Sequence, residues 1–104
     1  MSESKINITT SGTVDLGPDL PGYELQLRHL VVEPGGATGL HSHAKRPGVS
    51  YVAEGTLTVT GDDGSVHEHH VGEVIAESRD VTHRAENRGP GRTVLVSAYV
   101  MKKH

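Results

Sequence analysis

The chain has 104 residues, with 10 lysines and arginines against 13 acidic residues and a net charge of −3 at pH 7. This length suits one hydrophobic core, so we expect a single domain over residues 1–104. The weak negative charge excludes the basic surface that nucleic-acid binding needs, and no apolar run reaches the ~20 residues of a membrane-spanning helix. The lack of cysteine excludes disulfides and thiolate metal sites. Together with a first dozen residues unlike a signal peptide, it favours the cytoplasm.

Short β-strand patterns follow one another along the sequence. Ile6 and Ile8 alternate with polar residues, and we interpret residues 1–12 as an edge or exchanged strand. In the next segment, Tyr23–Val32, leucines alternate with Gln26 and Arg28, which is typical of a half-buried strand. Further strands are expected at residues 38–43, 49–53, 56–60, 65–71, 74–77, 81–87 and 92–101. The last of these is long and the most apolar, so we expect it to be central in its sheet.

Turn signals separate these segments, and no stretch has a convincing helical period. The clearest turn is the run Gly-Asp-Asp-Gly at residues 61–64, because Gly and Asp tolerate the positive φ angles of tight hairpins. Short strands at regular spacing with glycine at the turns indicate an all-β sandwich or barrel.

Three histidines are the best indication of chemistry. His41 and His43 are two apart in an expected strand, so both imidazoles point to the same face. His83 lies 40 residues further on in a second glycine-bounded segment. Three neutral imidazoles that converge across a barrel are suited to a divalent transition metal.

The spacing around these histidines resembles the two motifs of small single-domain cupins. In the first motif a glycine, a His-x-His pair, a glutamate and a glycine follow at fixed spacing. This chain has Gly35, His41, His43, Gly48 and Gly55 at those positions. The resemblance implies a cupin-type jelly-roll β-barrel with a metal in its interior.

The second motif is present with two departures. Gly72, His83 and Asn87 match it, whereas Ser78 replaces a proline and Asp80 a glycine. Both replacements lie in the turn before the histidine, where Ser and Asp can make local hydrogen bonds, so we expect the turn to be kept. The two motifs together cover about half of the sequence.

Gly48 stands where cupins usually have a glutamate as the fourth metal ligand. One interpretation is a degenerate barrel that has lost its metal, and the other is a three-histidine site of His41, His43 and His83. We favour the second, because a barrel without metal chemistry has no physical need for three converging imidazoles. Without the carboxylate, the metal would favour anionic ligands such as carboxylates, enolates or diketonates.

The resemblance implies a divalent transition metal, with iron, zinc, nickel, manganese and copper all compatible with imidazole ligands. We expect a metal-dependent enzyme of the dioxygenase, lyase or isomerase class that acts on a small anionic or enolisable substrate. No catalytic side chain is identified. The alternative is a non-catalytic small-ligand binding or sensor protein, with or without metal, because this fold hosts many chemistries.

Other polar residues are weaker candidates. His67 and His69 share a strand face and could bind a second metal, but a solvated strand is the simpler interpretation. Lys45 and Arg46 follow the His-x-His pair in a loop near the expected barrel mouth. They could attract an anionic substrate, although solvated loop charges are again simpler.

Two expectations concern the tyrosines and assembly. Tyr51 and Tyr99 could each place a hydroxyl near the cavity, but we interpret both as packing residues, and strand parity with position 48 points Tyr51 away from the metal. The exposed edges of a small barrel favour pairing with a second copy. We therefore expect a homodimer with residues 6–10 or Tyr23–Val32 at the interface.

Overall fold

The computed structural model describes residues 5–103, and this range contains β-strands and no α-helix. Consequently no helix that could cross a membrane is found there. The strands are β1 (Ile6–Asp15), β2 (Tyr23–Val32), β3 (His41–Ser42), β4 (Gly48–Glu54), β5 (Thr56–Gly61), β6 (Val66–His70), β7 (Val74–Glu77), β8 (Thr82–Glu86) and β9 (Thr93–Lys102).

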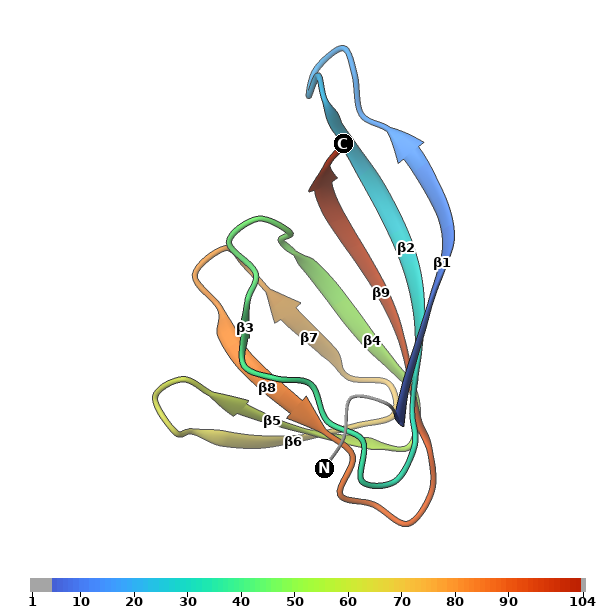
Figure 1. Cartoon of the computed structure of the whole chain (residues 1–104), viewed down its shortest axis with the longest axis vertical. Helices are drawn as coiled ribbons and strands as arrows, with labels where there is room; N and C mark the ends of the chain where they lie inside the picture. Colours follow the sequence, from blue (N-terminus) through green and yellow to red (C-terminus); the bar gives the residue numbers. More distant parts are fainter. Residues whose placement is uncertain (1–4, 104) are drawn as a thin grey trace.

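The strands form two antiparallel sheets that face each other (Figure 1). The larger sheet has the order β1-β2-β9-β4-β7, and the smaller has the order β3-β8-β5-β6. The expected all-β jelly-roll barrel is therefore confirmed. β9 lies between β2 and β4 in the middle of the larger sheet, as its apolar sequence predicts. The hairpin expected at residues 61–64 joins β5 to β6.

The hydrophobic core lies between the two sheets. Both sheets contribute to it, with Val52, Ile75 and Leu95 from the larger sheet and Leu57 and Val59 from the smaller. All five are at most 8% exposed. Burial of an aliphatic side chain of this size contributes about 1.5–3 kcal/mol, so this cluster is what holds the sheets together.

Strand β2 has the expected alternation but with the opposite face buried. Leu25 and Leu27 are 39% and 44% exposed, whereas Gln26 and Arg28 are the less exposed pair and Arg28 lines the cavity between the sheets. The barrel interior is polar beside Gln26 and Arg28, and the two leucines lie on the outer face of the larger sheet. Period two therefore identifies the strand but does not tell which face is inside.

Strand β1 is an edge strand, and it is longer than the short alternating segment in the sequence suggests. It pairs with β2 of the same chain from Ile6 to Asp15, with a register shift between Thr10 and Gly12. It lies at the outer edge of the larger sheet in Figure 1. Residues 6–12 of this segment are therefore part of an edge strand in this chain. Residues 1–4 of that segment lie outside the described residues.

Candidate metal centre

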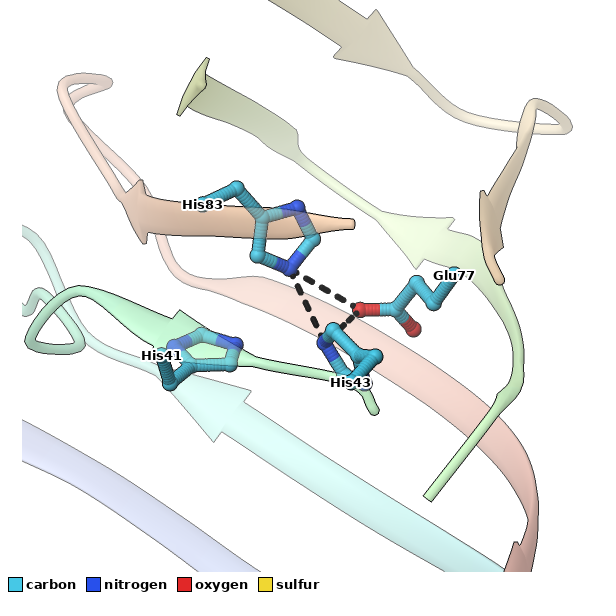
Figure 2. Close-up of side chains that lie close together, drawn as sticks. All are labelled: His41, His43, Glu77 and His83. Atoms are coloured by element: carbon cyan, nitrogen blue, oxygen red, sulfur yellow. Dashed lines mark hydrogen bonds and ion pairs between the residues drawn. The ribbon is translucent and has the colours of Figure 1, made fainter. Parts of the chain in front are cut away.

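Four side chains converge inside the barrel: His41, His43, Glu77 and His83 (Figure 2). One potential ligand atom from each lies within 4.8 Å of all the others. His43, Glu77 and His83 are buried, and His41 is half-buried. The structure thus brings together all three histidines of the sequence analysis and adds a carboxylate.

Backbone pairing positions the histidines. His41 in β3 is the direct partner of His83 in β8, so the two imidazoles start from adjacent strands. The backbone NH of His43 donates to the carbonyl of Val81 at 2.9 Å. The turn that precedes His83 is kept without proline or glycine, because the NH of Val81 donates to the carbonyl of Ser78 at 3.0 Å. Only His41–Ser42 of the expected strand at residues 38–43 is regular β-structure.

Glu77 places a carboxylate beside the histidines, where Gly48 has no side chain, so the cluster is larger than the three histidines that the sequence nominates. Glu77 is the last residue of β7 and the direct cross-strand partner of Gly48. On the other side of β4, Tyr99 is the second partner of Gly48. A Cβ atom at position 48 would overlap the carbonyl of Ala98 and the ring of Tyr99. A glutamate therefore has no room at position 48, and the acid enters from the neighbouring strand.

The sequence contained a signal for Glu77 that motif spacing hides. In the segment Val74–Glu77, period two places Glu77 on the same face as Ile75, and the alternation of exposed and buried residues in the structure bears this out. An acidic side chain on the apolar face of a strand requires a partner, because a buried carboxylate is costly unless it is paired. That requirement could have nominated Glu77 as a ligand candidate.

The spacing of the donor atoms fits a single metal ion. His43 Nε2 and His83 Nε2 are 3.0 Å apart, and Glu77 Oε2 lies 2.8 Å and 3.1 Å from them. Three mutually perpendicular bonds of about 2.1 Å, a usual metal–ligand length, place their donor atoms about 3.0 Å apart. The triangle therefore has the size that three adjacent ligands of one ion require.

Hydrogen bonds to the outer nitrogens fix which nitrogens face the centre. His41 Nδ1 lies 2.9 Å from the carbonyl of Gly39, and His43 Nδ1 lies 3.2 Å from the carbonyl of Arg46. A carbonyl oxygen only accepts, so each Nδ1 carries the hydrogen and each Nε2 of a neutral ring presents a lone pair. His43 Nε2 and Glu77 Oε2 are then two hydrogen-bond acceptors that face each other. A cation between them removes the repulsion between their lone pairs.

The protonation states also suit metal binding. Burial lowers the pKa of both His41 and His43 below 6.5, which favours neutral imidazoles. Burial alone would raise the pKa of Glu77. Hydrogen bonds from His83 and Ser50, together with the neighbouring imidazoles, outweigh this and lower it below 4.5. His41 and His43 thus present neutral nitrogens and Glu77 an anionic oxygen, the forms in which these groups ligate metals.

The second oxygen of Glu77 is held by hydroxyl groups. Ser50 Oγ donates to Oε1 at 2.5 Å, and Tyr99 Oη donates to the same oxygen at 3.1 Å. Ser97 Oγ lies 2.7 Å from Ser50 Oγ and extends the network. Such bonds orient the carboxylate and leave Oε2 free to face the histidines. Tyr99, expected only to pack, is thus part of the site, and its ring stacks on that of His43 at 5.7 Å.

A cavity of about 360 Å³ adjoins the cluster and opens to solvent. Its walls include His41, Glu77, His83 and Tyr99, and also Arg46, which we expected near the barrel mouth. Pockets of this size lie at the lower end of the range for small-molecule sites. A ligand can therefore reach the candidate metal centre.

The remaining candidates lie elsewhere. Tyr51 is 45% exposed and lies on the outer face, as strand parity predicts. The rings of His67 and His69 are 6.4 Å apart, but they are not part of a group that could hold a metal among residues 5–103. Lys45 is exposed and does not line the cavity.

Comparisons with known proteins agree with the fold. The sequence profile of the cupin domain family Cupin_2 matches residues 28–99. The protein TT1209 from Thermus thermophilus superposes with a TM-score of 0.73 at 16% identity, over 97% of this chain and 87% of that one. A cupin domain from Bordetella pertussis Tohama I gives 0.68 at 20% identity, over 91% and 92%. A cupin 2 domain-containing protein from Halorhodospira halophila gives 0.70 at 25% identity, over 95% and 66%. No curated protein matches significantly.

The substitution Gly48→Ala should destabilise the protein by about 1–3 kcal/mol, because the added methyl group overlaps the Ala98 backbone and the Tyr99 ring. Gly48→Glu should destabilise the protein at least as much, and the new carboxylate should not act as a metal ligand. Gly12→Ala is the control, since no atom lies within 4 Å of its Cβ position. Denaturant unfolding measures all three. Equal stability of the Gly48→Ala and Gly12→Ala variants would contradict the packing argument.

The metal-free protein should lose stability as the pH falls below 6.5. The lowered pKa values of His41 and His43 mean that the unfolded chain binds protons in this window that the folded chain does not. The contribution of His41 and His43 is therefore lost as the pH falls from 6.5 through their folded pKa values, whereas the lowered pKa of Glu77 acts only below 4.5. The pKa of His70 is raised by Glu73 and Glu68 and acts in the opposite direction, but this pair is exposed and screened by solvent. Thermal unfolding from about pH 8 to about pH 5 measures this effect. His41→Gln should flatten the dependence of the unfolding temperature on pH, and His29→Gln should not. A wild-type protein whose unfolding temperature does not change over this pH range would contradict the prediction.

Proposed function

Because this chain belongs to the cupin domain family, we propose that it binds a divalent transition metal through His41, His43, His83 and Glu77 and acts as a metal-dependent enzyme. The observation that carries this proposal is the triangle formed by His43 Nε2, His83 Nε2 and Glu77 Oε2, with sides of 2.8–3.1 Å. Iron, zinc, nickel, manganese and copper all accept imidazole and carboxylate ligands. When bound, such an ion supplies Lewis acidity or, for a redox-active metal, electron transfer to oxygen.

The protein's own residues hold and shield the ligands. Ser50 and Tyr99 fix one oxygen of Glu77, and the carbonyls of Gly39 and Arg46 fix the rings of His41 and His43. Burial excludes water from the inner side of the cluster, and the cavity admits a small molecule from the other side. This arrangement favours a substrate that reaches the ion through an oxygen atom, as an anionic or enolisable compound does.

The reaction class that we propose is dioxygenase, lyase or isomerase chemistry on a small anionic or enolisable substrate. The described cavity holds no acidic side chain besides Glu77, whose oxygens are already engaged with hydroxyls and histidines. This favours chemistry centred on the metal over proton transfer by a free side chain. A cytoplasmic location is proposed from the cysteine-free composition.

Metal titration tests the proposal. Protein stripped with a chelator should bind about one equivalent of zinc or cobalt(II) and unfold at a higher temperature when loaded. His83→Ala and Glu77→Gln should each weaken binding at least as much as the roughly 10- to 100-fold that loss of an outer-shell partner costs. His29→Ala and Glu33→Gln, both at exposed positions, are the matched controls and should bind as the wild type does.

Elemental analysis of protein from its native host identifies the ion. Oxygen uptake with a panel of β-diketones, thiols and hydroxy acids then tests for turnover. Absence of metal together with unchanged stability after chelation would overturn the metal proposal. A bound metal without turnover of any panel compound would instead favour a binding or sensor protein.

We also propose that a second copy of this chain covers the outer face of the larger sheet. Cross-strand pairing places apolar side chains there in adjoining rows: Val14, Leu25 and Val100; Leu27, Ala98 and Val49; Val96, Tyr51 and Val74. His29 is the β2 partner of Val96 in the third row, and the nine apolar side chains carry no charge. Flat apolar sheet faces pack well on one another, and a two-fold interface requires only that one patch be complementary to itself.

Light scattering during size-exclusion chromatography tests this assembly. The wild type should elute with a mass twice that of the 11.1 kDa chain. Leu27→Glu should yield monomers, because the interface would bury a charge at a side chain that is 44% exposed in the single chain. Val66→Glu is the control, at a 54% exposed position of β6 in the other sheet. A monomeric wild type would rule the interface out.

A further inference from the structure

The cavity beside the candidate metal centre holds two arginines that metal binding does not use. Arg28 comes from β2, Arg46 comes from the loop between β3 and β4, and both are half-buried. Their guanidinium carbons lie 5.5 Å and 5.0 Å from the ring centroid of Tyr99. Two cations therefore converge on the same aromatic ring, whose hydroxyl contacts Glu77.

Neither guanidinium has an acidic partner among residues 5–103. Arg28 donates from Nε to Gln26 Oε1 at 3.1 Å and from Nη2 to the Met101 sulfur at 3.4 Å, and both acceptors are neutral. Arg46 forms no ion pair in that part of the chain, whereas the more exposed Arg88 pairs with an acid. Half-buried charges without partners are unfavourable, so these two positions are suited to an anion that arrives from outside.

The charge balance of the cavity supports the same conclusion. The chain carries a net charge of −3, yet the described side chains that line the cavity include two arginines and a single acid, Glu77. The lining is thus positive even before a divalent cation is added, and each further positive charge increases the attraction for an anion.

We propose that Arg28 and Arg46 bind the carboxylate end of a small organic acid whose other end faces the metal cluster. This inference rests on the proposed function and names its substrate class. The planar guanidinium fork matches a carboxylate in a bidentate manner. The same fork also matches phosphate, and the choice of a carboxylate rests on the small cavity with its largely aliphatic lining, which suits a singly charged group on an apolar body.

The rest of the cavity indicates the shape of the acid. Much of its remaining lining is aliphatic, with Ile6, Ile8, Leu30, Leu57 and Leu95 among the residues. The volume of about 360 Å³ admits a small molecule with a short apolar body. The expected ligand is therefore a short-chain carboxylic acid and not a sugar or a nucleotide.

Binding of butyrate tests the proposal, measured by NMR titration of labelled protein in both metal-free and zinc-loaded form. Arg46→Gln and Arg28→Gln should each raise the Kd about tenfold or more in both forms, since each removes a charged hydrogen bond. Arg46→Lys should give an intermediate loss, because it keeps the charge without the fork. Arg84→Gln is the control, at an exposed position of β8. Butyramide, the neutral isostere, should bind at least about tenfold more weakly than butyrate.

The outcomes separate this proposal from the metal proposal. Arginine-dependent butyrate binding in a protein that takes up no metal supports the arginine site and overturns the metal site. Metal binding with butyrate affinity unchanged in both glutamine variants overturns the arginine site alone. Tighter binding of methyl phosphate than of butyrate overturns the choice of a carboxylate. Thermal unfolding checks that each variant is folded, and Arg46→Lys serves as the test if a glutamine variant is not.

Discussion

The contact of Tyr99 and Glu77 across Gly48 is the constraint on which the rest of the site depends. The three residues lie side by side on β9, β4 and β7, and position 48 has no side chain, so its neighbours can close over it. This closure puts the Tyr99 hydroxyl on one oxygen of Glu77 and leaves the other oxygen facing His43 and His83. A larger residue at position 48 would separate the tyrosine from the acid.

Tyr99 also links the candidate metal centre to the cavity. Its ring stacks on the ring of His43 and also lies close to the guanidinium groups of Arg28 and Arg46. Because an aromatic face attracts cations, the ring holds the arginines at the cavity wall without neutralising them. Their charge therefore stays available to an incoming anion, while the tyrosine hydroxyl keeps the carboxylate of Glu77 in place.

The interior of the barrel is divided between these polar groups and an apolar core. Val52 and its neighbours from both sheets fill one level, and Ser50, Ser97 and Glu77 lie at the level next to it. The buried polar atoms at this level are connected to one another by hydrogen bonds, which reduces the cost of burying them. The apolar level holds the sheets together, and the polar level provides the candidate site.

Much of the fold was predictable because it depends on local pattern. Period-two alternation located β2 to the residue, the strand expected at residues 74–77 matches β7, and the glycine- and aspartate-rich run at residues 61–64 predicted its hairpin correctly. Motif spacing nominated His41, His43 and His83, which the structure places together. The inner face of β2 was not predictable, since alternation is the same whichever face is buried. The length of β1 was not predictable either, because its residues are nearly all exposed and its extent is set by pairing with β2.

The sequence by itself determined the all-β class, the positions of most strands and the three histidines, because each rests on residues close together in the chain. Only the tertiary structure decided which carboxylate joins the histidines and which arginines line the cavity. Glu77 meets His43 across two sheets, and Arg28 and Arg46 meet at a tyrosine far from both in sequence. Such contacts depend on sheet pairing and on the room left by Gly48, which motif spacing does not contain.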